Sequence, residues 1–185
     1  MPIVPLILLI AMLAVIYFDA TRFIIPNWLV GGLLLLYPLA VYISSAPVAW
    51  QTDLLGMLGA FAIGYVIFAL RLMGGGDVKL IIVLSLWVGV TKLADFGFYF
   101  ALLGGVMSLV ILILRKIMPH ITSKKLPRVL RDKEPVPYGL AIAGAFLILL
   151  NNGQISAASV QIQPLSPPLA SPEAPQSDSS ALPQK

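Results

Sequence analysis

Two aspartates stand where long apolar runs end, and a carboxylate is costly to hold in such surroundings. Asp19 follows sixteen largely aliphatic residues, and Asp77 follows the glycines 74–76 in the stretch "RLMGGGDVKLII". Two carboxylates close together in a low-dielectric site cannot easily both ionise, so they share one proton and titrate as a unit. Such a pair can deprotonate a water molecule and protonate a leaving amine without a covalent intermediate.

A structural role is the alternative for each aspartate. Asp77 could cap the helix that follows it, and Asp19 could mark the end of an apolar helix, paired with Arg22. Capping alone does not explain three glycines, because Ser or Asn would cap as well and one glycine is enough to break a helix. Three glycines lower stability unless the backbone needs unusual dihedrals or is closely approached, for example by a facing helix or an extended peptide.

The remaining acids have simpler interpretations. Asp53 and Asp95 each precede an apolar run, and we expect them to cap the helices that follow. Four further acids lie in polar segments and are most simply solvated charges: Asp132, Glu134, Glu173 and Asp178.

The residues that other common catalytic mechanisms require are missing from the sequence. The chain has no cysteine, and its single histidine, His120, lies in the most charged segment, where we expect a solvated side chain. HExxH, GxSxG and Walker motifs are also absent from the sequence. We therefore predict no metal site and no cofactor, and the two aspartates remain as the candidate catalytic residues.

The composition indicates an all-α membrane protein. Of the 185 residues, 59% are hydrophobic and 11% are charged, whereas soluble domains carry roughly 25% charged residues. The sequence predicts about six transmembrane helices in a domain covering residues 1–150, although several apolar runs are shorter than the roughly 20 residues of a typical span. The first run has no basic residue before it, so we expect a retained span and not a cleaved signal peptide. The six runs cover residues 2–18, 28–43, 54–70, 78–94, 96–114 and 136–150.

The distribution of basic residues predicts the topology. The first, third and fifth connections hold ten of the twelve Lys and Arg residues, and the positive-inside rule places these connections in the cytoplasm. Asp19 and Asp77 then lie at the same membrane face. Because the basic residues sit mainly between apolar runs, the net charge of +4 does not indicate nucleic-acid binding.

Two segments outside the spans differ in composition. The basic loop at 115–135 is expected to anchor the topology and to contact anionic membrane lipid. Residues 151–185 are rich in Pro, Ser, Ala and Gln, and they predict a disordered tail that cannot bury enough apolar surface to fold.

Three segments together resemble a known family. "GGGD" at 74–77 matches the GxGD motif, "FDATRFIIPNWL" at 18–29 resembles the segment with the first catalytic aspartate, and "VPYGLAIAGA" at 136–145 resembles the last span. In this order they resemble the bacterial type IV prepilin peptidases, which are GxGD-type membrane aspartic proteases. The short form is similar to the CpaA or TadV subfamily, which serves tight-adherence (Flp) pili.

The resemblance implies an activity and a set of site residues. Asp19 and Asp77 would be the catalytic pair, at the cytoplasmic face of the bacterial inner membrane. The partners would be prepilin substrates, cut between a short leader and an apolar helix, with pilus-assembly machinery as a possible further partner. Candidate substrate-binding residues are Gly74, Gly75, Gly76, Lys79, Asn27 and Pro137. For some of these a structural role is at least as well supported: a topology charge for Lys79, a cap of the second span for Asn27, and a helix start for Pro137 with Tyr138.

One departure from the family concerns two further properties. Longer members carry an N-terminal cytoplasmic segment with paired cysteines that bind zinc, and they also N-methylate the new terminus. This sequence has no cysteine, so we expect neither a zinc site nor methyltransferase activity.

Two other functions stay open on sequence grounds. The chain could be a small transporter or channel subunit in which the aspartates relay protons, or an inactive scaffold for pilus assembly. A proton relay would more naturally place its acids in mid-span, and none of the eight acids lies clearly there.

Overall fold

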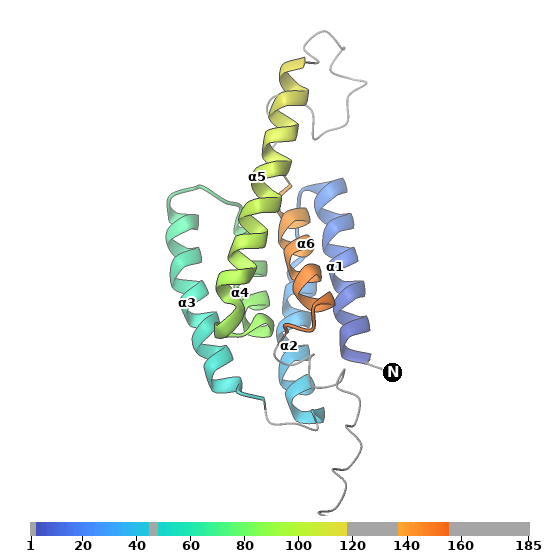
Figure 1. Cartoon of the computed structure of the whole chain (residues 1–185), viewed down its shortest axis with the longest axis vertical. Helices are drawn as coiled ribbons and strands as arrows, with labels where there is room; N and C mark the ends of the chain where they lie inside the picture. The colour runs from blue at the N-terminus through green and yellow to red at the C-terminus, as the bar shows by residue number, and fades with distance from the viewer. Residues whose placement is uncertain (1–2, 45–47, 118–136, 156–185) are drawn as a thin grey trace, which may run out of the picture.

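The expectation of an all-α fold is confirmed by the computed structural model shown in Figure 1, which describes residues 3–44, 48–117 and 137–155. Within these residues there are six α-helices and one short 3-10 helix, and each α-helix overlaps one of the six apolar runs. The elements are α1 (Ile3–Arg22), α2 (Asn27–Ile43), α3 (Trp50–Ala69), α4 (Gly75–Val88), η1 (Val90–Lys92), α5 (Leu93–Ile117) and α6 (Tyr138–Asn151).

Three segments are long and apolar enough to cross a membrane. They are α1, α3 and the continuous segment 90–117, which joins η1 to α5. Helices α4 and α6 have 14 residues each, which corresponds to a length of about 21 Å, shorter than the ~30 Å hydrocarbon core of a bilayer. That all six helices span the membrane therefore stays a prediction. Most of the basic loop, including His120, and nearly all of the predicted tail lie outside the described residues.

The two short helices form the interior of the bundle. Helix α4 packs against α2, α3 and α6, while α6 also packs against α1 and α5. Trp87 of α4 and Phe146 of α6 are completely buried. The longer helices carry exposed apolar side chains, such as Ile63 and Phe98, and such a surface suits contact with lipid. The central position of α4 fixes its first turn, and therefore Asp77, relative to the rest of the molecule.

A buried polar cluster joins α2, α3 and α4 near the start of α3. The Tyr37 hydroxyl donates a hydrogen bond of 2.6 Å to the Asp53 carboxylate, and the Trp87 indole N–H donates one of 3.0 Å to the Leu33 carbonyl. The Tyr37 and Trp87 rings meet edge to face at 5.3 Å. This cluster stabilises the bundle at the opposite end of α3 from the Asp77 segment.

The capping roles predicted for Asp53 and Asp95 were wrong. The N-cap residue of α3 is Ala49, with no side-chain cap, and Asp53 lies one turn further on, where Tyr37 reaches it. Asp95 lies inside the first turn of α5 and pairs with Lys92 at 3.1 Å. The partner of Asp53 comes from another helix and is not visible in the local sequence, whereas Lys92 precedes Asp95 by only three residues.

Candidate active site

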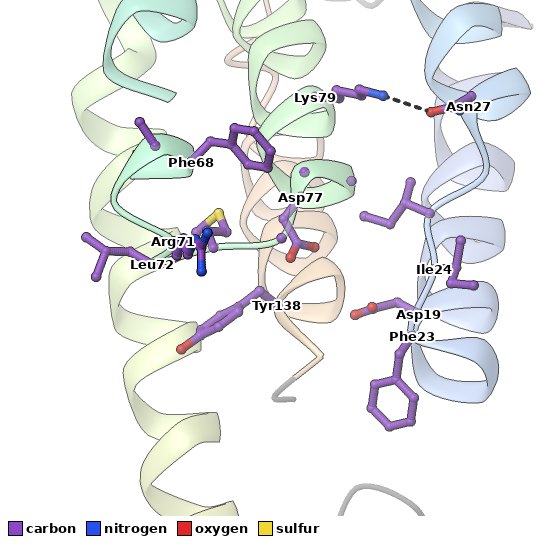
Figure 2. A pocket seen from close by; sticks show the side chains of 16 residues that line it. Asp19, Phe23, Ile24, Asn27, Phe68, Arg71, Leu72, Asp77, Lys79 and Tyr138 are labelled. Carbon is purple, nitrogen blue, oxygen red and sulfur yellow. Dashed lines mark hydrogen bonds between the residues drawn. The ribbon is translucent and has the colours of Figure 1, made fainter. Parts of the chain in front are cut away.

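A cavity of about 960 Å³ lies at the end of the bundle where α1 and α3 finish and α4 and α6 begin. Both Asp19 and Asp77 line it, and Figure 2 shows their side chains in the same space. Helix α5 passes this end and extends beyond the other helices (Figure 1). The other lining residues are Phe23, Ile24, Ile25, Asn27, Phe68, Ala69, Arg71, Leu72, Met73, Gly74, Gly75, Gly76, Lys79 and Tyr138.

Asp19 is held by the first turn of α6. Its side chain is buried, with 4% of the residue exposed. The Leu140 backbone N–H donates a 3.0 Å hydrogen bond to Oδ2, and Gly139 lies directly beside this carboxylate. The first N–H groups of a helix have no partner within the helix, so Asp19 caps α6 from another helix. This contact orients the carboxylate and joins α1 to α6.

Gly139 is required by this arrangement. A Cβ atom at position 139 would lie 2.8 Å from Cγ and Oδ2 of Asp19. Distances below 3.0 Å are sterically forbidden, so any side chain here would displace the carboxylate or the helix. Gly139 was not among the predicted site residues, although it lies in the segment "VPYGLAIAGA". The sequence could have pointed to Gly139, because it lies at the start of an expected helix where no turn or helix end requires a glycine.

Asp77 occupies the first turn of its own helix. The N-cap residue of α4 is Gly74, which makes Asp77 the third residue of the helix. Its carboxylate reaches back beside Gly74, the direction in which the acidic residue of a capping box points. A Cβ at Gly74 would lie 3.0 Å from Oδ2 of Asp77, so this glycine makes room for the carboxylate. Asp77 is therefore not the N-cap residue that the alternative role required, and its half-buried carboxylate lines the cavity.

The other two glycines bring neighbouring segments close to α4. A Cβ at Gly75 would lie 3.2 Å from the Phe68 ring, and one at Gly76 would lie 3.4 Å from Cβ of Ile25. Part of the glycine cluster is therefore explained by packing of α3 and of the α1–α2 connection against the start of α4. All three glycines also line the cavity, so the site remains open beside Asp77.

Helices α1 and α3 end at the cavity, and each is followed by a residue whose backbone adopts the left-handed conformation. Phe23 has φ +54° and donates its N–H to the Asp19 carbonyl at 3.0 Å, and Arg71 has φ +56°. They are the only residues other than glycine with positive φ in the described parts of the chain. Such conformations cost non-glycine residues roughly 1–2 kcal/mol, and strained backbone clusters at functional sites. Both side chains line the cavity.

Lys79 and Asn27 meet across the cavity wall. The Lys79 ammonium donates a 3.4 Å hydrogen bond to the Asn27 side-chain carbonyl, which links α4 to α2 (Figure 2). Asn27 was expected to cap α2, but the N-cap residue is Pro26 and no side chain caps this helix. Asn27 is the first residue of the helix and serves as an acceptor for Lys79.

Pro137 differs from the other candidates. It is the N-cap residue of α6 and is buried, and it is not among the residues that line the cavity. Its neighbour Tyr138 lines the cavity in its place. Arg22, the considered partner of Asp19, instead lies over the ring of Phe18, with its guanidinium carbon 5.4 Å from the centroid.

The electrostatics of the site depend on the two carboxylates. Asp19 and Asp77 are near enough for the charge of Asp19 to act on Asp77, and they come from α1 and α4, which are 58 positions apart in sequence. Within the described ranges, no group of three His, Asp or Glu side chains could hold a metal ion. A carboxylate pair in a cavity at a membrane-protein surface can perform acid–base chemistry on a bound molecule.

The architecture and the site thus define a helical membrane protein with a pair of interacting carboxylates. Residues 6–113 match the model of the type IV leader peptidase family, Peptidase_A24. The match covers more than half of the chain and includes both aspartates, so the protein belongs to this family of aspartic-type leader peptidases. No curated protein and no solved structure is significantly similar to it.

Proposed function

We propose that this protein removes the leader peptide from type IV prepilins, with Asp19 and Asp77 as the catalytic pair. The observation that carries the proposal is that the two aspartates, which come from different helices, line one cavity. Family membership supplies the reaction class, and it favours a peptidase over a proton-relaying transporter or an inactive scaffold. We further assign the protein to the subfamily that serves Flp pili, on the sequence resemblance described above.

The proposed reaction needs only water, the peptide and the two carboxylates. One carboxylate takes a proton from a water molecule while the water oxygen bonds to the carbonyl carbon of the scissile peptide. The other, protonated carboxyl group gives its proton to the departing nitrogen as the C–N bond breaks. The products are a leader with a new carboxyl terminus and a pilin with a new amino terminus.

The cavity suits an extended peptide. Its volume of about 960 Å³ lies at the upper end of the range of about 300–1,000 Å³ for ligand sites. Gly74 to Gly76 leave the backbone accessible beside Asp77, while Lys79, Asn27 and Tyr138 supply polar groups around it. We assign these residues to substrate binding, with the cavity at the cytoplasmic face of the inner membrane.

Co-expression with a candidate Flp-type prepilin tests this function. We expect a shorter pilin in the presence of the peptidase, and mass spectrometry of the intact product should show one cut between the leader and the apolar segment, without an added methyl group. An unprocessed prepilin in the presence of correctly inserted wild-type peptidase would contradict the proposal. A methylated product would contradict only the absence of methyltransferase activity.

A further inference from the structure

A second opening lies between α3 and α5. Both helices pack against α4 and η1 while making little contact with each other. The space between them has a volume of about 280 Å³. On α3 it is lined by residues from Leu55 to Ile67 that share one face, which corresponds to a length of about 18 Å along the helix. We call this space the α3–α5 groove.

The groove is apolar throughout. Its polar side chain is Ser85, whose hydroxyl donates a 2.6 Å hydrogen bond to the Ile82 carbonyl and is therefore already satisfied. Its lining residues include no charged side chain and no free hydrogen-bonding side chain, so none of them could hold a lipid headgroup. The groove therefore suits an occupant with an uninterrupted apolar surface.

The glycines of the groove fall into two kinds. A Cβ at Gly56 would lie 3.2 Å from the Val90 nitrogen, and one at Gly64 would lie 2.9 Å from Val78, so these glycines seat α3 tightly on η1 and α4. At Gly59 on α3 and Gly97 on α5, an added Cβ would meet nothing within 4 Å. The packing of this chain does not require glycine at these two positions, and they leave the groove wall flat and open. Small residues at such positions allow two membrane helices to approach closely.

The groove adjoins the candidate active site. Met73 lines both the groove and the catalytic cavity. Before and after Met73 in the sequence, adjacent residues line different spaces. Ile67 and Val78 line the groove, whereas Phe68 and Asp77 line the cavity. A segment that leaves the groove at this end therefore enters the cavity beside Asp77.

We propose that the α3–α5 groove binds the apolar helix of a membrane-anchored substrate and directs the chain beyond the helix end into the cavity. This inference rests on the proposed function and specifies how a substrate is positioned. An α-helix is about 10 Å wide, so it would lie against the groove from the lipid side and insert only side chains. The helix would end near Met73, and the adjoining extended segment would pass Gly74 to Gly76. A site arranged in this way would cut just outside a membrane helix.

Variants that fill the groove test the proposal in intact membranes. Gly59→Val and Gly97→Val place methyl groups in open space, so folding should be kept. We expect each to cut a membrane-anchored prepilin at least ~10-fold more slowly than wild type, a loss of about 1.4 kcal/mol. The matched control is Gly105→Val, since Gly105 is also an exposed glycine of α5 with open space at its Cβ, but does not line the groove. It should cut at the wild-type rate.

Photocrosslinking gives a readout that does not depend on filling the groove. A benzophenone probe at Ile63, in the groove, should crosslink to the prepilin, while a probe at Leu58, on the opposite face of α3, should not. Crosslinks from Ile63 only to lipid, or to a second copy of this chain, would overturn the proposal. Wild-type rates for both groove variants would also overturn it while leaving the proposed function intact. Failure of the wild-type protein to cut the prepilin would instead reject the proposed function.

Discussion

The carboxylate of Asp19 occupies the space that a side chain at position 139 would fill. Atoms Cγ and Oδ2 of Asp19 lie 2.8 Å from the place where a Cβ of residue 139 would be. The Leu140 N–H bonds the same carboxylate at 3.0 Å. The first turn of α6, more than a hundred residues further along the chain, therefore fixes the position of Asp19, one of the two candidate catalytic carboxylates.

This relationship predicts that Gly139→Ala impairs cleavage without removing a catalytic group. The added methyl must move the carboxylate or the helix, and a displacement of about 1 Å can reduce catalysis about 100-fold. We expect overpacking to lower the free energy of unfolding by about 1–3 kcal/mol. Prepilin cleavage rates and thermal unfolding in detergent measure the two effects separately.

Gly144→Ala is the matched control on the same helix. An added Cβ there would meet only the end of the Leu103 side chain, at 3.0 Å, and this flexible side chain can move. Cleavage close to the wild-type rate is expected. Equal activity of the two alanine variants would show that the Asp19–Gly139 contact is not needed to position the carboxylate.

The sequence revealed the aspartates but not the contacts that hold them. Basic residues between apolar runs indicated that Asp19 and Asp77 share one face, because topology depends on charge placement, which is visible in the sequence. The contact of Asp19 with Gly139 depends on how α1 and α6 pack, and no local pattern specifies that packing. The same limit explains why Asp53 was expected to be a helix cap, whereas its position is determined by Tyr37 from another helix. The close approach inferred from the glycines at 74–76 is present, but Ile25 and Phe68 account for part of it.

Gly76→Val tests whether the glycine cluster also keeps the site accessible. A Cβ at this position would lie 3.4 Å from Ile25, and the two further methyl groups of valine would meet Ile25 or enter the cavity. We expect cleavage to fall at least ~10-fold, with a loss of stability of up to about 3 kcal/mol. Gly31→Val, at a position where an added Cβ meets nothing within 4 Å, provides the comparison. Full activity of Gly76→Val in a cleavage assay would rule out an access role for this glycine.

The buried cluster at the other end of α3 should affect stability and not catalysis. Tyr37→Phe removes the hydroxyl that donates to Asp53, of which only 3% is exposed. Loss of a partner for a buried polar group costs about 1–3 kcal/mol. We expect a lower unfolding midpoint in detergent, together with unchanged cleavage at temperatures where the protein stays folded.

Tyr42→Phe is the control for this prediction. Tyr42 is 86% exposed, so loss of its hydroxyl should leave the unfolding midpoint unchanged. If Tyr37→Phe unfolds at the same temperature as Tyr42→Phe, the hydrogen bond to Asp53 makes no net contribution to stability.

The most direct test of the carboxylate pair is the cleavage rate of Asp19→Asn and Asp77→Asn, each measured against Asp95→Asn. Asp95 pairs with Lys92 near the start of α5 and does not line the cavity, so its substitution controls for the loss of an acid elsewhere in the protein. We predict that each of the first two variants inserts normally into the membrane and loses activity by at least about 10²- to 10⁴-fold, while Asp95→Asn cuts prepilin at nearly the wild-type rate. Near-normal cleavage by either Asp19→Asn or Asp77→Asn would contradict the assignment of these two aspartates as the catalytic pair.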